Sequence, residues 1–321
     1  MESISIKNLI ILLSNQRRRY DPADFIDIGN RVAASAADIR VYVIGEQTPN
    51  TQLPKDIWKL PTLTVAFSPK KLTFVPPRGR IIFNRQIQKL EQARILNLVG
   101  IPIPHCEMFR PGMALDPAIW GDIVLLKPAP LYMTSHGDSI QIFRRSRLAS
   151  MNMSDFPVNH LLRSAPMIVQ KFVDTGLYPC KYRALTLCGE VLYAQFRKLV
   201  APRPDLSSSD DVLLSAQVAT SGGSCQYFHD DYPDVVSFAK RVANAFPNIP
   251  LLGVDIVRDV VSQELCVLEV NAGGNTWHFS SKMWDERRRL HPEVVEGTKK
   301  QYNAFDTAAK SLISATRRWA S

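Results

Sequence analysis

The sequence has few of the patterns that mark several common classes of protein. Its five cysteines are scattered without a C-x-x-C pair and its six histidines are equally dispersed, so no zinc-binding spacing is present. No apolar run approaches the ~20 residues that a membrane-spanning helix needs. The first seven residues lack the charged start, apolar middle and cleavage site of a secretory signal peptide. We therefore expect reduced, mostly buried thiols, no membrane partner and a cytoplasmic location.

Positive charge is plentiful, but it is not clustered. The formal net charge is +9, and a strongly basic chain is a candidate for nucleic-acid binding only where its basic residues gather. The runs Arg17–Arg19, Arg287–Arg289 and Arg317–Arg318 are short and have no aromatic interleaving. We interpret them as solvated helix faces, with attraction of an anionic substrate or nucleotide as the alternative, and expect no nucleic-acid partner.

The composition is that of an ordinary globular protein with a sizeable core. The chain has 321 residues, 45% of them hydrophobic and 21% charged, which suits two or three subdomains. In residues 1–85, apolar strands at 6–14, 40–46 and 63–68 alternate with an amphipathic helix at 25–39. This alternation predicts a small α/β unit with a parallel sheet. No G-x-G-x-x-G follows the first strand, so the dinucleotide-binding fingerprint is absent.

The next segment combines a helix with a strand–loop–strand unit. The residues before Gly100 predict a helix that stops there, because Pro residues follow. Two strands then flank the loop Leu131–Ser139, whose small residues Ser135 and Gly137 can bring backbone N–H groups close to phosphate oxygens. Lys127 ends the first strand, and its ammonium suits a phosphate, although a surface lysine at a strand end is the alternative.

The most informative stretch, residues 253–279, predicts a hairpin with acidic side chains in its strands. Two apolar strands are joined by a polar turn near Ser262. With the turn centred there, Asp255 lies opposite Glu269, and Asn271 shares their face because side chains alternate with period two. Polar groups inside apolar strands are costly unless they are paired or liganded, although a lone acidic residue is more often solvated surface. Two carboxylates and an amide oxygen suit Mg²⁺ on a nucleotide.

Other elements surround this hairpin. Residues 167–173 predict an apolar strand interrupted by Gln170–Lys171. A second hairpin is predicted over residues 181–199, with its turn at Gly189–Glu190. The polar, Ser-rich residues 201–231 predict a mobile loop over the site.

Taken in order, these elements resemble the ATP-grasp superfamily. The 253–279 hairpin with its Gly-rich turn is similar to the metal-binding end of that family, in particular the carboxylate–amine ligase branch resembling ribosomal-protein glutamate ligase and D-alanine–D-alanine ligase. The resemblance implies an α/β (α+β) chain with the ATP-grasp fold. It further implies a small N-terminal α/β pre-ATP-grasp domain over residues 1–85, a linker helix and small lobe over 86–175, and a C-terminal lobe with the metal site and C-terminal helix over 176–321.

The resemblance also assigns roles to residues. It implies that Asp255, Glu269 and Asn271 hold two Mg²⁺ ions on the phosphates of ATP. Arg183 matches an Arg near the transferred phosphate, and Lys181 stands where the family usually has an acidic residue for the ribose. The catalytic cations would be Lys127, Arg183 and Arg197. The other implied nucleotide contacts are Lys127, Ser135 and Gly137 for the phosphates, Gln170, Lys171, Phe172 and Val173 for adenine, Asp174 for the ribose, and Lys198 in a basic pair with Arg197.

The activity implied by the resemblance is ATP-dependent amide formation. ATP would phosphorylate a substrate carboxylate, and an amine would attack the acyl-phosphate to give an amide, ADP and phosphate. The carboxylate and amine could belong to small molecules or peptides, and dimers are common among similar enzymes. Two alternatives stay open: a nucleotide-binding protein with little catalysis, and a kinase acting on a hydroxyl. Trp277 and His278 either contact substrate or pack as an aromatic wall.

Overall fold

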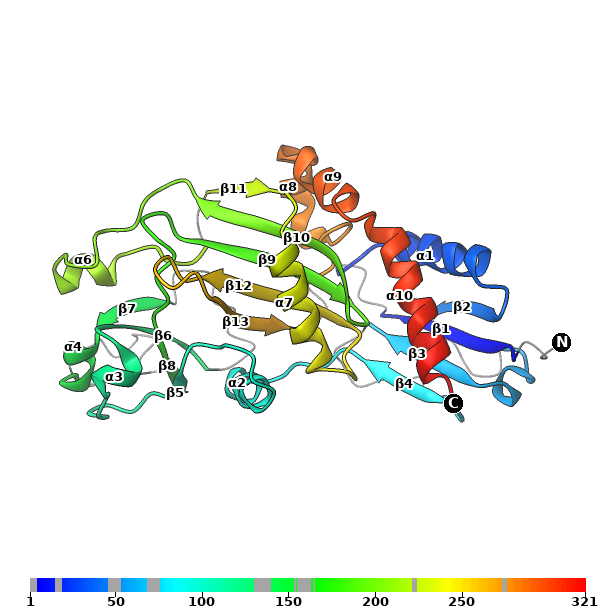
Figure 1. Cartoon of the computed structure of the whole chain (residues 1–321), viewed down its shortest axis with the longest axis horizontal. Coiled ribbons are helices and arrows are strands. Elements are labelled where there is room, and N and C mark those ends of the chain that lie inside the picture. Colours follow the sequence, from blue (N-terminus) through cyan, green and yellow to red (C-terminus); the bar gives the residue numbers. More distant parts are fainter. Residues whose placement is uncertain are drawn as a thin grey trace.

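The chain folds into three β-sheets that lie side by side (Figure 1). A computed structural model describes residues 5–14, 19–45, 53–67, 76–129, 140–152, 165–220, 224–272 and 276–321, together with residues 154 and 163. A four-stranded sheet lies at one end beside the C-terminal helix, a five-stranded sheet lies in the middle, and a second four-stranded sheet lies at the other end. The fold is therefore mixed α/β, as predicted.

The N-terminal sheet is parallel throughout, with strand order β2-β1-β3-β4, which confirms the prediction. Its elements are β1 (Lys7–Leu13), α1 (Pro22–Ser35), β2 (Ile39–Gly45), the 3-10 helix η2 (Ile57–Lys59), β3 (Thr62–Ala66) and β4 (Arg80–Phe83). Residues 9–13 of β1 are a continuous apolar run because α1 and the C-terminal helix cover one face and η2 covers the other. α1 begins three residues before its predicted start because the Asp21 carboxylate caps it, accepting from the Ala23 N–H at 2.9 Å.

The small sheet at the other end is antiparallel, with strand order β5-β8-β6-β7. This part contains α2 (Lys89–Leu98), β5 (Cys106–Met108), α3 (Pro117–Trp120), β6 (Ile123–Pro128), β7 (Gln141–Arg144), α4 (Arg145–Ala149) and β8 (Met167–Lys171). α2 stops as predicted, and Gly100 just beyond it has a φ of 65°, which favours glycine. The loop between β6 and β7, with Ser135 and Gly137, lies outside the described residues.

The central sheet is antiparallel, with strand order β11-β10-β9-β12-β13. This part contains β9 (Cys180–Leu187), β10 (Glu190–Leu199), α6 (Asp210–Leu214), β11 (Cys225–Phe228), α7 (Pro233–Asn244), β12 (Leu251–Arg258) and β13 (Leu265–Asn271). β9 and β10 form the predicted hairpin, but its two-residue turn is Cys188–Gly189, one residue earlier than predicted. Both turn residues have positive φ, 47° and 94°, as tight hairpin turns require.

The two faces of the central sheet have different chemistry. Even-numbered strand residues such as Ala184, Ala194 and Val254 pack with α7 in an apolar core. Odd-numbered residues such as Arg183 and Asp255 are on the opposite face, because side chains alternate along a strand. The sheet therefore presents a row of polar side chains on its second face.

The C-terminal helices join the central sheet to the N-terminal sheet (Figure 1). They are the 3-10 helix η4 (Lys282–Trp284), α8 (Asp285–Leu290), α9 (Pro292–Lys300) and α10 (Ala304–Trp319). The Ser311 hydroxyl of α10 donates to the Leu187 carbonyl at the end of β9. On the other side of α10, Arg317 forms an ion pair with Asp38 at 2.8 Å. This helix therefore fixes the position of one sheet against the other.

The described parts of the chain bear on two further expectations. No helix in the described ranges combines the length and apolar character that a membrane span requires. The cysteines are free, as expected, and each is partly buried. Cys180 and Cys225, for example, line a solvent-accessible cavity.

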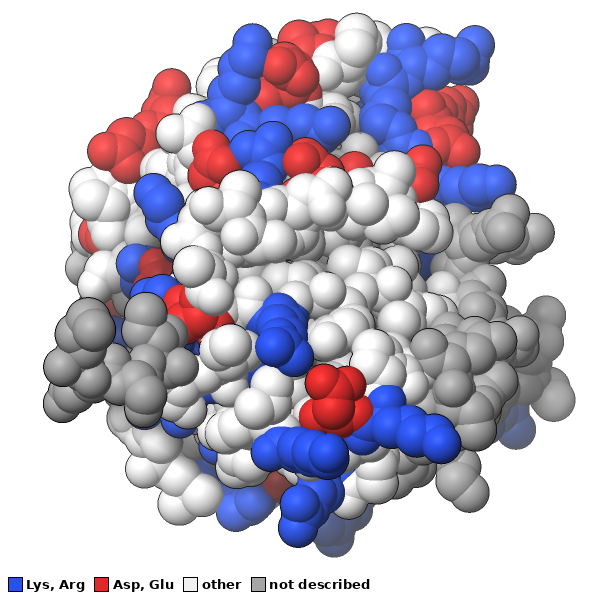
Figure 2. Space-filling view, turned by 90° about the vertical axis from the view of Figure 1, so that its right-hand side faces the viewer, with Lys and Arg blue, Asp and Glu red and all other residues white. Residues whose placement is uncertain are grey.

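Basic and acidic side chains are intermixed on the end of the molecule seen in Figure 2. Blue and red groups lie together at the top of this view, blue groups surround a red one at the bottom, and most of the area between them is uncharged. Ion pairs near this end include Arg31 with Asp27 and Asp306. The positive charge on this face is therefore not gathered into one patch.

Trp277 joins the sheets and provides a test of the fold. Its fully buried ring lies 4.6 Å from that of Phe25, centroid to centroid, and its indole N–H donates to Asp24 at 2.7 Å. We expect Trp277→Ala to lower the free energy of unfolding by about 3–5 kcal/mol because it leaves a cavity. The control Ile26→Ala removes an exposed side chain of α1 and should change it by less than ~0.5 kcal/mol. Urea denaturation measures both, and equal effects would contradict this account.

Candidate functional site

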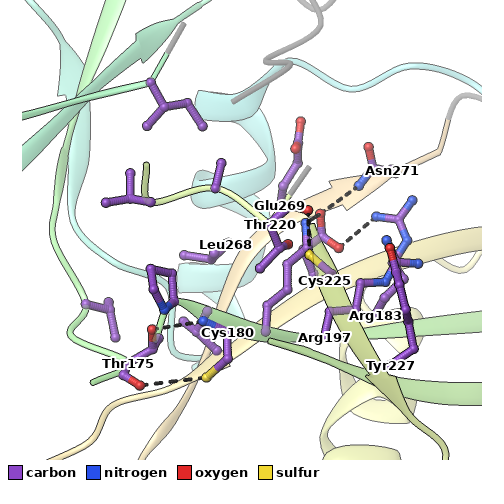
Figure 3. Close-up of a pocket in the computed structure, with 18 of the residues that line it drawn as sticks. Thr175, Cys180, Arg183, Arg197, Thr220, Cys225, Tyr227, Leu268, Glu269 and Asn271 are labelled. Carbon is purple, nitrogen blue, oxygen red and sulfur yellow. Dashed lines mark hydrogen bonds and ion pairs between the residues drawn. The ribbon is translucent and has the colours of Figure 1, made fainter. Parts of the chain in front are cut away.

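A cavity of about 870 Å³ is lined by the polar face of the central sheet together with β6, β8 and α8. Seven Lys or Arg side chains and three Asp or Glu side chains line it. The predicted residues among its lining are Lys127, Gln170, Phe172, Val173, Arg183, Arg197, Asp255, Glu269 and Asn271. Residues from both predicted hairpins therefore meet in one place (Figure 3).

The predicted register of the acidic hairpin is confirmed. Asp255 pairs with Glu269 and Gly253 with Asn271 across β12 and β13. A bulge then shifts the register, so that Ile256 pairs with Val267. The bulge lies on the turn side of the acidic pair, so it leaves Asp255, Glu269 and Asn271 on one face.

Asp255 is held by cations from the neighbouring strand β9. Its Oδ1 lies 2.8 Å from Nη1 of Arg183, and its Oδ2 lies 3.2 Å from Nζ of Lys181. The amide nitrogen of Asn271 donates to Oδ2 at 3.5 Å. Burial alone would raise the pKa of the Asp255 carboxyl, but the charges of Arg183, Lys181 and Arg197 outweigh it and hold the pKa well below its usual range.

Gly253 makes room for the arginine in this arrangement. A Cβ atom at this position would lie 2.9 Å from Cζ of Arg183 and 2.7 Å from Cγ2 of Thr276. The guanidinium therefore crosses β12 directly over the glycine to reach Asp255. A side chain here would displace it.

Glu269 lies near Arg183 and near two lysines from other elements. Lys127 of β6 and Lys89 of α2 both line the cavity, and each is within electrostatic reach of Glu269. Burial lowers the pKa of both ammonium groups, and Glu269 opposes that shift. Lys89 also donates to the Pro128 carbonyl at 2.9 Å. These two lysines are therefore positioned to meet an anionic ligand.

No role was predicted for Lys89, although the spacing of residues in its helix could have indicated one. It is buried with Gln92, Ala93 and Leu96, which follow at the i+3, i+4 and i+7 spacing of one helix face. A lysine on the buried face of an amphipathic helix needs a partner. Gln92 has a related role, because its side chain bonds both backbone groups of Val270 at 2.8 and 2.9 Å and so fixes the outer edge of β13.

An aromatic and cationic wall closes the opposite side. Arg197 donates to Gln195 at 2.8 Å, and its guanidinium lies 5.0 Å from the Trp284 ring and 5.7 Å from the Tyr227 ring. Arg287 lies over the same two rings at 4.8 Å. The interpretation of Arg287–Arg289 as a solvated face is therefore wrong for Arg287, because α8 turns this side chain into the cavity.

Trp277 and His278 have separate roles. Trp277 packs in the aromatic core, whereas His278 lines the cavity and stacks on Trp284 with ring centroids 3.9 Å apart. Its Nδ1 is 2.6 Å from the Tyr193 hydroxyl. Burial lowers the pKa of His278 well below its usual value, and Arg197 and the other nearby cations lower it further. Burial also raises the pKa of Tyr193 to about 12.

Only some residues of the segment that was predicted to bind adenine line the cavity. Gln170, Phe172 and Val173 line the cavity. The Phe172 N–H donates to the Ile123 carbonyl at 3.3 Å. The Val173 N–H makes no backbone hydrogen bond among the described residues, so it is the better placed of the two to bond an adenine edge. Lys171 is exposed and is not in the lining, because it alternates with Gln170 along β8.

Asp174 and Lys198 also lie outside the cavity lining. Asp174 forms an ion pair with Arg203 at 2.8 Å and accepts from the Gly176 N–H. Lys198 follows Arg197 on β10 and therefore points to the other face, where it lies 4.7 Å from the Tyr178 ring. The structure thus does not bring these two side chains to the cavity face that carries Asp255 and Glu269.

The donor atoms near Glu269 fit a Mg²⁺ ion. Glu269 and Asn271 lie two residues apart on one face of β13, and no described residue donates a hydrogen bond to the Glu269 carboxylate. Because the Asn271 amide nitrogen faces Asp255, its oxygen is directed away from that carboxylate. The described residues contain no group of three or more His, Cys, Asp and Glu that could hold a metal. A site here would combine these two oxygens with phosphate and water, as Mg²⁺ accepts.

Comparison with known proteins identifies the fold. No family model and no curated protein matches the sequence. The ATP-grasp ligase PsnB, solved with its minimal precursor, aligns over 96% of this chain and 99% of its own at 16% identity and a TM-score of 0.51. A RiPP-associated ATP-grasp ligase from Chryseobacterium gregarium, solved with ADP and a leader and core peptide, aligns over 96% and 97% at 11% identity and a TM-score of 0.52. The chain therefore has the ATP-grasp fold.

The buried His278 makes the stability of the protein depend on pH. The unfolded chain takes up a proton near pH 6.5 that the folded chain excludes, so the free energy of unfolding should fall as the pH drops below that value. This one group contributes at most ~1.4 kcal/mol per pH unit. We expect His278→Gln to remove that part of the slope, measured by urea denaturation between about pH 7 and 5. Tyr193→Phe keeps the buried imidazole and should keep the slope; an unchanged slope in His278→Gln would contradict the assignment.

Proposed function

We propose that the chain is an ATP- and Mg²⁺-dependent ligase that joins a carboxylate to an amine through an acyl-phosphate. The observation that carries the proposal is the row formed by Glu269, Asp255 and Arg183 on three adjacent strands, facing the same cavity as Lys127. An acidic metal-binding edge next to fixed cations is the arrangement that phosphoryl transfer requires.

The lining residues suggest how ATP would lie. Gln170, Phe172 and Val173 would meet the adenine, and Lys89 and Lys127 would meet the phosphates. Glu269 and Asn271 would hold Mg²⁺, which neutralises phosphate charge when bound. This orientation is supported by the cavity because Lys89 and Lys127 line it within electrostatic reach of Glu269.

The reaction would proceed in two steps that need no covalent enzyme intermediate. A carboxylate oxygen attacks the γ-phosphorus, the bond to the bridging oxygen breaks, and ADP leaves with that electron pair. An amine then attacks the acyl carbon, loses a proton and displaces phosphate. Arg183 and Arg197 point at the cavity and would stabilise the charge that develops on the transferred group.

Peptides are one class of carboxylate substrate that a specific observation favours. PsnB and the Chryseobacterium gregarium ligase were each solved with a precursor or a leader and core peptide. The excess of cations in the cavity suits an acidic side chain as the activated group. Small-molecule acids and amines fit the same chemistry.

Product analysis distinguishes the proposal from its alternatives. ADP release in the presence of Mg²⁺ would be measured over a panel of amino acids and acidic peptides, and the products would be weighed by mass spectrometry. An amide supports the ligase. A phosphorylated product would identify a kinase, and ATP binding without turnover on any acceptor would identify a nucleotide-binding protein.

Substitution of Glu269 tests the site directly. We expect Glu269→Gln to reduce ADP release by more than about 100-fold, because the amide loses the charge that a hard cation needs. Glu264→Gln is the matched control, since Glu264 is exposed at the turn of the same hairpin and should retain wild-type turnover. Wild-type ADP release by Glu269→Gln, with thermal unfolding unchanged in both variants, would overturn the proposed role.

A further inference from the structure

The carboxylate of Asp255 already has a protein cation on each of its oxygens. Arg183 lies 2.8 Å from Oδ1 and Lys181 lies 3.2 Å from Oδ2. The side chain of Asp255 is 9% exposed and that of Lys181 is 17% exposed. This ion pair is therefore mostly withdrawn from solvent.

Lys181 reaches Asp255 because of the order of the strands. Lys181 and Arg183 are two residues apart on β9, so they share a face, and β9 lies next to β12. Arg197 is directly opposite Lys181 on β10 and adds a third cation to the same face. A further cation bound to Asp255 would have to displace a cation that already contacts one of its oxygens.

The neighbouring Glu269 differs from Asp255 in its direct contacts. It lies in the same row and within electrostatic reach of Arg183, Lys89 and Lys127, but none of the described residues donates a hydrogen bond to its carboxylate. Asn271 directs its amide nitrogen to Asp255 and thus its oxygen elsewhere. The row therefore offers open oxygen ligands at Glu269 and Asn271, and a satisfied carboxylate at Asp255.

We propose that Lys181 is a built-in replacement for a second metal ion, so that this chain uses a single Mg²⁺ ion, held by Glu269 and Asn271. Its ammonium supplies at Asp255 the fixed positive charge that an ion would otherwise bring to the phosphates. The inference rests on the proposed function, and it replaces the two-ion expectation with one ion. The lysine is a positioning and charge-supplying residue rather than a reacting one.

Counting bound Mn²⁺ ions tests the inference without relying on activity. Mn²⁺ would be titrated into the full chain saturated with the non-hydrolysable nucleotide AMP-PCP, and free Mn²⁺ would be read from its electron paramagnetic resonance signal. We expect one bound ion per nucleotide complex in the wild type and two in Lys181→Met, where Oδ2 of Asp255 is released. Lys181→Gln is a second variant, and thermal unfolding checks that each variant is folded.

Lys240→Gln is the matched control. Lys240 also pairs with a carboxylate, Glu190 at 2.7 Å, but both side chains are exposed on the surface. This variant should bind one ion, like the wild type.

Three other outcomes would each overturn the inference, and one of them would also overturn the ligase proposal. Two ions in the wild type would overturn the inference and leave the ligase proposal intact. One ion in both Lys181 variants would also overturn it, because the lysine would then not be what excludes the second ion. A wild type that binds no AMP-PCP would overturn the ligase proposal and this inference together.

Discussion

The ion pairs of Asp255 are the interaction on which the site depends. A buried carboxylate is costly unless it is paired, and removing one partner of a buried pair typically costs about 3–5 kcal/mol. Arg183 and Lys181 meet this requirement from the adjacent strand, and Arg183 can do so only because Gly253 has no side chain. The pairs cross from β12 to β9, so they hold the acidic hairpin in register with the strand that carries the cations.

Positive charge is more concentrated in the cavity than on the end of the molecule seen in Figure 2. On the end seen in Figure 2, basic groups lie beside acidic ones, whereas the cavity lining has more than twice as many cations as anions. Burial lowers the pKa of Lys89 and of Lys127, which means that their charged forms are stabilised less well in the empty cavity than in water. A polyanionic ligand relieves that cost. The cavity lining thus carries an excess of positive charge that a polyanionic ligand would neutralise.

Local periodicity made part of this structure predictable. The parallel N-terminal sheet, the stop after α2 and the pairing of Asp255 with Glu269 follow from apolar patterns and turn positions that span few residues. Arg287 could not be found that way, because its place depends on how α8 packs against Tyr227 of β11, which is distant in the sequence. Lys171 and Lys198 were assigned by resemblance, and strand alternation turns both away from the cavity.

The role of Lys181 follows from the order of the strands rather than from any single strand. The pattern of the β12–β13 hairpin places its acidic side chains on one face, but the strand beside β12 decides which protein cations meet them. Had β13 been the inner strand, Glu269 would face the cations of β9 and Asp255 would lie at the edge. With the observed order β9-β12-β13, Asp255 forms ion pairs with the cations of β9, whereas no described residue donates a hydrogen bond to the Glu269 carboxylate. Which carboxylate of the hairpin is paired with cations is therefore a property of sheet topology, which the hairpin sequence alone does not contain.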